Sequence, residues 1–143
     1  MKTGMLIRRR ILLLAALISL ALPATLQAQF TFVTNNGAIT IKGYTGSDGS
    51  VVIPSMTNGW PVTGIANIAF WNNFIITNVT IPDSITTIGH DAFNGCGFLL
   101  NVTMGNSIAS IGDDAFYNCI NLRSITIPST ITSLGGGGVL CVP

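Results

Sequence analysis

The residues of this sequence whose types could support chemistry are one histidine, a few aspartates and three cysteines, Cys96, Cys119 and Cys141. Cys96 and Cys119 occupy equivalent places in two similar stretches, and His90, the only histidine, directly precedes Asp91. Zinc needs about four ligands, and a nucleophile needs a base within hydrogen-bonding reach. One histidine cannot meet the first need, and no serine, cysteine or carboxylate has a candidate base partner. We therefore predict that the protein is not an enzyme and holds no metal or cofactor.

The spacing between the cysteines belongs to a repeat that runs through most of the chain. Copies begin at Val62, Ile85, Ile108 and Ile131, at a constant step of 23, and apolar positions align from copy to copy. A fixed period in the twenties is typical of leucine-rich-repeat solenoids, in which each copy is one coil. One coil cannot bury its apolar side alone, whereas stacked coils bury each other's. The sequence therefore predicts a solenoid of parallel β coils.

Each copy contains two short extended segments and one tighter turn. Residues 79–81, Val-Thr-Ile, alternate inward and outward, as a strand with one buried face does. A second extended piece ends in glycine, and Gly89 and Gly112 suit a turn that needs unusual backbone angles. The sequence Asp-Ala-Phe at residues 91–93, repeated at 114–116, predicts a short helical or 3₁₀ turn with its alanine and phenylalanine buried.

One complete copy carries the frame I-x-x-I-G-x-x-A-F-x-x-C-x-x-L-x-x-V-x-I-P. Its positions are filled by Ile108, Ile111, Gly112, Ala115, Phe116, Cys119, Leu122, Ile125, Ile127 and Pro128. This frame resembles the BspA-like leucine-rich repeat family of bacterial secreted and surface proteins, and the resemblance covers about Val51 to Gly135. It implies a curved parallel-β solenoid that serves adhesion or recognition and performs no catalysis.

Residues 1–28 have the pattern of a secretory signal peptide. Lys2 and Arg8–Arg10 form a basic start, and Ile11–Leu22 is a short apolar run. A membrane-spanning helix needs about 20 consecutive apolar residues, so this run is too short. We predict cleavage near Ala28, export to the outside or the cell envelope, and no membrane span after cleavage. An uncleaved membrane anchor is the alternative.

The rest of the chain divides into a cap, a solenoid and a tail. Residues 29–50 predict an N-terminal capping hairpin and turn, since Asn35-Asn36-Gly37 separates two alternating segments. Residues 51–135 are the solenoid, with five extra residues placed at Met56–Pro61. Residues 136–143 match no column, so we expect an atypical, disordered tail. Because an uncapped coil exposes apolar columns, we also expect end-to-end self-association.

Charge excludes nucleic acid as a partner. The chain has a formal net charge of +1, but four of its six basic residues lie in the signal segment. The remainder keeps two basic and five acidic residues, a net charge of −3. Such a surface has no basic patch that could attract phosphates.

The cysteines and two aspartates each allow two interpretations. In adjacent coils Cys96 and Cys119 would lie roughly 5 Å apart, close enough for a disulfide. Asn73, which fills the same column, favours two buried thiols instead. Asp91 and Asp114 suit caps of the short helical turn. Calcium binding is the alternative for them, although no D-x-D-x-D loop supports it.

Thr80, Thr103 and Thr126 form an outward column on the predicted strands and are the candidate recognition face. Threonine also suits exposed strand positions without any ligand. Aromatic residues on predicted loops either stack on a ligand or pack on neighbouring coils; they are Trp60, Trp71 and Tyr117. We predict a secreted or cell-surface module that recognises a protein or a glycan. The alternative is a structural spacer, or a remnant of a longer surface protein, with no ligand of its own.

Overall fold

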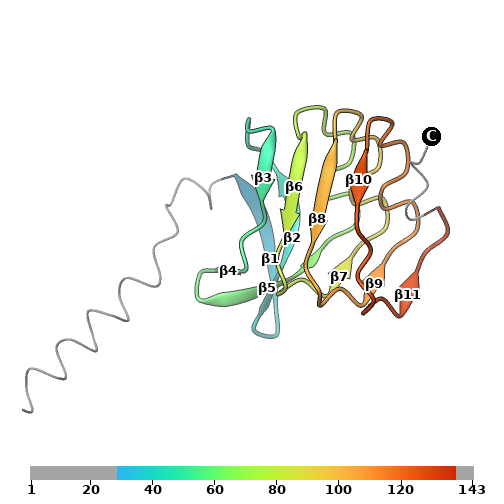
Figure 1. Ribbon diagram of the computed structural model, residues 1–143. Coiled ribbons are helices and arrows are strands. Elements are labelled where there is room, and N and C mark those ends of the chain that lie inside the picture. The colour runs from blue at the N-terminus through green and yellow to red at the C-terminus, as the bar shows by residue number, and fades with distance from the viewer. Residues whose placement is uncertain (1–28, 138–143) are drawn as a thin grey trace, which may run out of the picture.

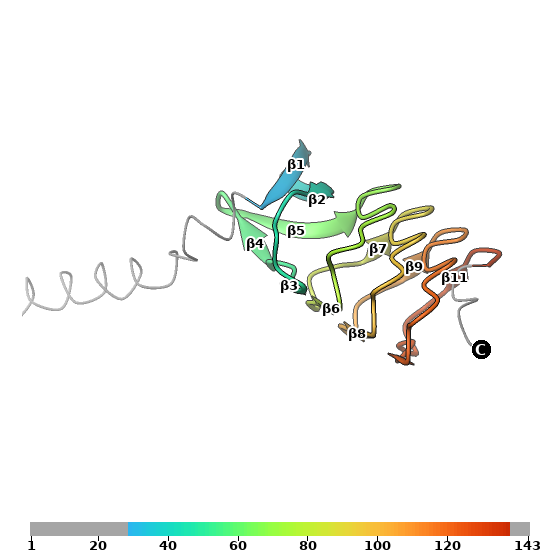
Figure 2. The ribbon, with the colours of Figure 1, turned by 90° about the horizontal axis from the view of Figure 1, so that it is seen from above.

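The computed structural model describes residues 29–137, which form a parallel β solenoid (Figure 1). Successive coils stack along one axis, with β1 (Phe30–Asn35) at one end and β11 (Ser133–Leu134) at the other, as Figure 2 shows from above. The proposed signal segment, residues 1–28, lies outside the described residues, as do residues 138–143 with Cys141.

The strands form two sheets, one on each side of the stack. The first sheet has the order β1-β2-β5-β7-β9-β11, with β4 paired to β5, and the second has the order β10-β8-β6-β3. The first contains β1, β2 (Ala38–Tyr44), β4 (Met56–Thr57), β5 (Trp60–Ile65), β7 (Thr87–Ile88), β9 (Ser110–Ile111) and β11. The second contains β3 (Ser50–Val52), β6 (Asn78–Ile81), β8 (Asn101–Met104) and β10 (Ser124–Ile125). The two extended segments predicted for each copy therefore lie in different sheets.

Strand pairing follows the period of the sequence. Val79 pairs with Val102, and Ile88 pairs with Ile111, so each residue pairs with its equivalent in the next copy. Val51 of β3 pairs with Val79, a step of 28, and the five extra residues form a small antiparallel hairpin of β4 with β5. The predicted solenoid and the predicted place of the extra residues are confirmed.

The core lies between the two sheets and contains a continuous stack of aromatic rings. Phe70, Phe93 and Phe116 are buried, and their ring centroids are 4.6 Å and 5.1 Å apart along the stack. Tyr44 continues the stack toward the N-terminus, with its ring 5.9 Å from that of Phe70. The core loosens toward the C-terminus, where Ile127 is 38% exposed.

The predicted N-terminal hairpin is present and extends the first sheet. β1 and β2 pair antiparallel, and β2 pairs parallel with β5. The turn between them has φ of 46° at Asn36 and 81° at Gly37, which matches the tight hairpin turn that Asn-Gly favours. The hairpin thus covers the first-sheet edge of the first coil.

Gly89 and Gly112, which occupy equivalent positions in two copies, allow close contact between coils. They do not adopt the unusual backbone angles that the sequence led us to expect. Gly89 and Gly112 are absent from the residues of the structure with positive φ. A Cβ on Gly112 would come within 2.5 Å of the backbone nitrogen of His90, and one on Gly89 would come equally close to that of Asn67. Only glycine lets two backbones approach this closely.

The predicted helical turns at 91–93 and 114–116 are tight turns instead, and residues 29–137 contain no helix. No described segment therefore has the helical length and apolar character that a membrane crossing would require. Asp91 and Asp114 have φ of 54° and 53°, a left-handed conformation that aspartate adopts more readily than most residues. They shape the turn and do not cap a helix. Ile68, the equivalent residue of the first coil, has φ of 54°, which strains a β-branched side chain.

The glycine run near the C-terminus continues the repeat. Gly135 N donates to the Ile111 carbonyl at 2.9 Å, and Asp114 N donates to the Gly136 carbonyl at 3.0 Å. Gly137 has φ of 66°, in the left-handed position that Asp114 occupies one coil earlier. The expectation that the pattern fails after Gly135 is therefore wrong for Gly136 and Gly137.

Candidate functional site

The threonine column lies on the outer face of the second sheet. Thr80 and Thr103 are register partners in β6 and β8, and both are exposed. Val52 of β3, also exposed, precedes them in the same row. Thr126 is exposed too, but it lies beyond the end of β10, so it is outside the paired part of the row. The structure thus brings two of the three predicted residues together in one ladder.

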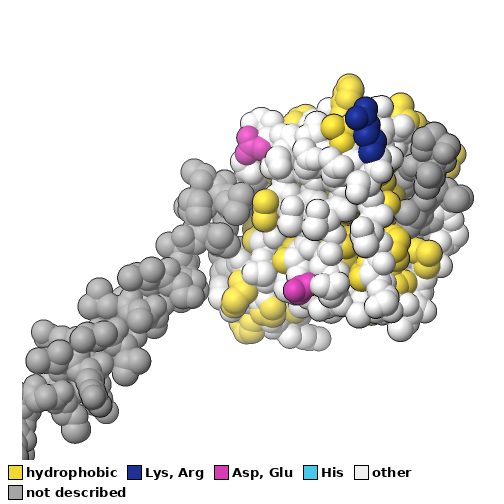
Figure 3. All heavy atoms as spheres, viewed as in Figure 1, with side chains coloured by type: hydrophobic (Ala, Val, Ile, Leu, Met, Phe, Trp, Pro, Cys, Tyr) yellow, Lys and Arg dark blue, Asp and Glu magenta, His cyan; other side chains and the backbone are white. Residues whose placement is uncertain are grey.

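A second polar row runs beside the threonines. Asn78 and Asn101 are register partners, and the Asn101 amide nitrogen donates to the Asn78 amide oxygen at 2.8 Å. Ser50 and Ser124 flank them in the same register. Figure 3 shows this face with few charged side chains. The face offers a regular array of hydroxyl and amide groups, which can form hydrogen bonds without removing charges from water.

Cys96 and Cys119 are buried thiols, as the sequence favoured, and they form no disulfide with each other. The Cys96 thiol donates to the Phe70 carbonyl at 3.0 Å, and the Cys119 thiol donates to the Phe93 carbonyl at 3.2 Å. Burial raises the pKa of Cys96 to about 12. A thiol with such a pKa is not a nucleophile at neutral pH, so Cys96 has a structural role.

His90 connects two coils. Its Nδ1 lies 2.9 Å from the Asp113 carbonyl oxygen, and its Nε2 lies 2.7 Å from an Asp91 carboxylate oxygen. Asp91 also accepts a hydrogen bond from the Asn94 amide. Among residues 29–137, no three histidine, cysteine or acidic side chains come close enough to hold an ion. Both ring nitrogens therefore face acceptors within the protein.

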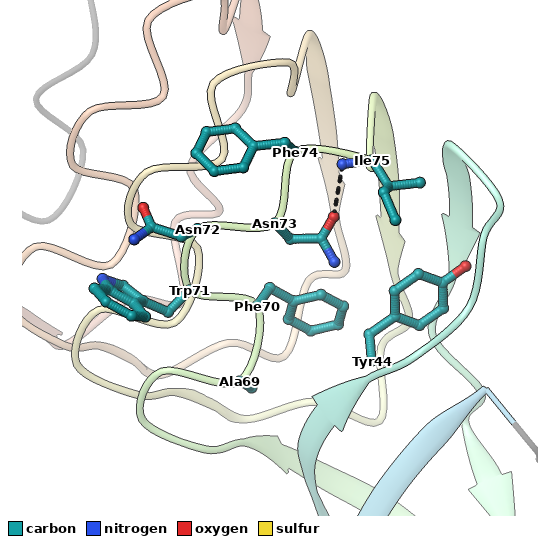
Figure 4. A pocket seen from close by; sticks show the side chains of 8 residues that line it. All are labelled: Tyr44, Ala69, Phe70, Trp71, Asn72, Asn73, Phe74 and Ile75. Carbon is teal, nitrogen blue, oxygen red and sulfur yellow. Dashed lines mark hydrogen bonds between the residues drawn. The ribbon is translucent and has the colours of Figure 1, made fainter.

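A pocket of about 370 Å³ lies where the first turn of the repeat meets the end of β2 (Figure 4). Trp71 and Phe74 are 56% and 60% exposed at its rim. The Tyr44 hydroxyl donates to the Asp48 carbonyl at 3.2 Å, and burial raises the pKa of Tyr44 above its ordinary value. The lining contains no charged side chain; it consists of Tyr44, Ala69, Phe70, Trp71, Asn72, Asn73, Phe74 and Ile75.

The three aromatic residues singled out in the sequence do not share one site. Trp71 lines the pocket, whereas Trp60 lies at the start of β5, beside Gly37 of the hairpin turn. Tyr117 is exposed two coils away. Sequence reasoning missed Tyr44 and Phe74 in the pocket. Phe74 could have been found, because the next copy has Gly97 in its place and so leaves room for a ring.

The loops that lead into β6, β8 and β10 lie at the upper edge of Figure 1, and they carry exposed apolar side chains. The exposed members are Phe74, Ile75, Phe98 and Ile120. They precede the strands of the second sheet and join the pocket to the polar face. The described surface therefore has two adjoining candidate regions, one polar and one aromatic.

These features define a class of protein: a leucine-rich-repeat solenoid whose described residues include exposed ladders and a pocket. The BspA type leucine rich repeat region matches residues 49–137. The chain belongs to this family. Solenoids of this kind are typically non-enzymatic binding scaffolds, and the family is one of protein-interaction modules.

Solved structures show the same fold. A leucine-rich repeat protein of T. pallidum is 30% identical with a TM-score of 0.73, over 76% of this chain and 51% of that one. A leucine-rich cell surface protein of Faecalibacterium prausnitzii is 33% identical with a TM-score of 0.69, over 76% of this chain and 31% of that one. This chain thus spans about half of the first protein and a third of the second. No curated protein matches the sequence.

Proposed function

We propose that the chain is a recognition module of a secreted or cell-surface protein, and that it binds a partner protein without catalysing a reaction. The observation that carries this proposal is the outer face of the second sheet. There Thr80 and Thr103 pair in register beside the bonded amides of Asn78 and Asn101. Strands that hold side chains at fixed spacing preorganise a binding surface.

Charge and location support the same proposal. The two basic and five acidic residues after the signal segment give a surface that does not attract nucleic acid. The basic start and short apolar run within residues 1–28 fit export. The relative from F. prausnitzii is described as a cell surface protein.

The test is a binding screen with variants of the polar face. Purified protein would be probed against an array of soluble proteins and oligosaccharides, beside the double variant Thr80→Arg with Thr103→Arg. Two bulky charges on the face should weaken binding to a protein partner at least tenfold. The matched control is Thr87→Arg with Ser133→Arg, which adds equal charge at exposed strand positions of the first sheet.

Each outcome separates the alternatives. Loss of binding in the face variant alone supports the proposal. Binding that both variants retain, or that both lose, would show that the polar face is not the contact. Binding to oligosaccharides alone would replace the protein partner with a glycan. No binding at all would favour a structural spacer.

A further inference from the structure

Backbone hydrogen bonds join the turns of successive coils as a ladder, and all of these bonds run in the same direction along the stack. In each turn, alternate N–H groups donate to carbonyls of the following coil. The first step joins Ile68, Phe70 and Asn72 to His90, Ala92 and Asn94 at 3.0, 2.7 and 2.8 Å. The second joins Asp91, Phe93 and Gly95 to Asp113, Ala115 and Tyr117 at 3.0, 2.7 and 2.9 Å. Carbonyls of each turn therefore face the preceding coil.

The first turn has no preceding turn to satisfy these carbonyls. Asn67, Ala69 and Trp71 occupy the places that His90, Ala92 and Asn94 hold in the next coil. Among the described residues, no donor reaches the carbonyl oxygens of those three first-turn residues. Two of them, Ala69 and Trp71, line the pocket.

In the same turn, one side chain has a hydrogen-bond donor that lacks an acceptor. Cys96 donates to the Phe70 carbonyl of the coil before it, and Asn73 is the equivalent residue one coil earlier. The Asn73 amide oxygen accepts from the N–H groups of Ile75 and Ile76 at 2.9 and 3.1 Å, which fixes the amide orientation. Its amide nitrogen has no acceptor among the described residues. Figure 4 shows this nitrogen on the side of Phe70 and Tyr44.

The cap replaces the preceding coil only in part. The Tyr44 ring takes the place of a phenylalanine in the aromatic stack. Yet β2 pairs with β5 and gives no backbone donor to Ala69 or Trp71. The pocket therefore combines carbonyl acceptors, one amide donor and the exposed rings of Trp71 and Phe74.

We propose that this pocket binds an extended segment of a partner polypeptide. The structure shows what fits such a turn, because in the later coils the same carbonyls accept peptide N–H groups of alternate residues. Bound peptide N–H groups would pair with the Ala69 and Trp71 carbonyls, and a peptide carbonyl would accept from Asn73. An apolar side chain would lie against Trp71 and Phe74. This is recognition by backbone addition, as at a sheet edge, and it rests on the proposed protein partner.

The probe is a synthetic peptide with the sequence of residues 89–99, the turn whose N–H groups serve the next coil. It carries Cys96→Ser to prevent oxidation, and Phe93→Ala because Tyr44 already fills that place in the stack. The protein carries Trp60→Phe, which leaves Trp71 as its only tryptophan. Its fluorescence then reports on the pocket. We expect a saturable blue shift as the peptide covers Trp71.

Two matched controls test the hydrogen bonds. N-methylation of the peptide at positions 91, 93 and 95 removes the donors of the ladder and should weaken binding at least tenfold, whereas N-methylation at position 92 should not. In the protein, Asn73→Asp keeps the acceptor oxygen but removes the donor, and should also weaken binding at least tenfold. Asn106→Asp adds the same charge on a distant exposed turn and should have no effect. The urea midpoint of each variant confirms that it folds.

Equal binding of the two methylated peptides would overturn the proposal, as would unchanged binding by Asn73→Asp. A blue shift with cellohexaose but not with the peptide would assign the pocket to a saccharide instead. Failure here leaves the polar face untouched, since the variants of Thr80 and Thr103 test that surface separately. Retained partner binding with no peptide binding would therefore reject the pocket alone.

Discussion

The aromatic stack makes Phe93 the side chain whose removal should affect the fold most clearly. Its ring is fully buried, with a centroid 4.6 Å from that of Phe70 and 5.1 Å from that of Phe116. The interplanar angles are 11° and 4°, so the three rings lie nearly parallel. Phe93→Ala would leave a cavity in the middle coil and break two ring contacts at once.

The magnitude follows from these contacts. Truncating a buried phenylalanine to alanine costs about 3–5 kcal/mol. Aromatic pairs contribute about 0.5–1.5 kcal/mol beyond the area that they bury. Because Phe93 loses a ring contact on each side, we expect a value near the upper end, about 4–5 kcal/mol. A domain of this size has a total stability of about 5–15 kcal/mol, so the variant should remain folded only marginally.

Urea denaturation followed by circular dichroism measures this loss. With an m-value of about 2 kcal/mol per molar, a loss of about 4 kcal/mol lowers the midpoint by about 2 M. The matched control is Phe98→Ala, the same substitution five residues later at a ring that is 57% exposed. Its midpoint should fall by less than about 0.5 M, since an exposed ring loses little burial.

Equal midpoints for the two variants would refute the assignment of buried and exposed faces. Coils of a solenoid contact only their neighbours, so a damaged middle coil can also uncouple the two halves. Tryptophan fluorescence reports on the N-terminal part, where Trp60 and Trp71 lie, and circular dichroism reports on the whole. Separate transitions in Phe93→Ala alone would show uncoupling and would still support its central place.

Three further predictions use single substitutions or labelling. Gly112→Ala should destabilise the protein by at least about 1 kcal/mol in urea melts, because its Cβ would meet the His90 backbone, whereas the Cβ of Gly136→Ala would make only an ordinary contact with Asp113 at 4.0 Å and should be tolerated. Ile68→Asn should raise stability by about 1 kcal/mol, since asparagine adopts a left-handed φ with less strain. Cys96, with its pKa raised by burial to about 12, should resist iodoacetamide at pH 8 until urea is added, as peptide mass spectrometry would show.

The repeat could be predicted because it depends on which residues recur. Valine at 79 and 102, or isoleucine at 88 and 111, marks the buried face in every copy, and in-register pairing then follows from the period. The Asn-Gly pair at 36 and 37 specified the hairpin turn for a similar local reason. These features need no knowledge of distant contacts.

The structural role of some residues in the repeat could not be predicted in the same way. A glycine column fits a left-handed turn and a close contact equally well, and only the 2.5 Å approach of Gly112 to His90 decides between them. The left-handed residue lies two positions later, at Asp114, where an aspartate also suits a helix cap. One residue type can have two structural roles, and the distance between coils determines which role it has.

The pocket was harder still to predict, because its polar groups belong mostly to the backbone. Every residue has a carbonyl, so no motif marks Ala69 or Trp71 as acceptors. Their availability follows from the direction of the ladder, which leaves acceptors at the first turn and satisfies the same groups in each later turn. A cap that completes the sheet but not the turns leaves those acceptors open beside Tyr44. The site thus arises from where the repeat begins, and side-chain motifs alone could not have revealed it.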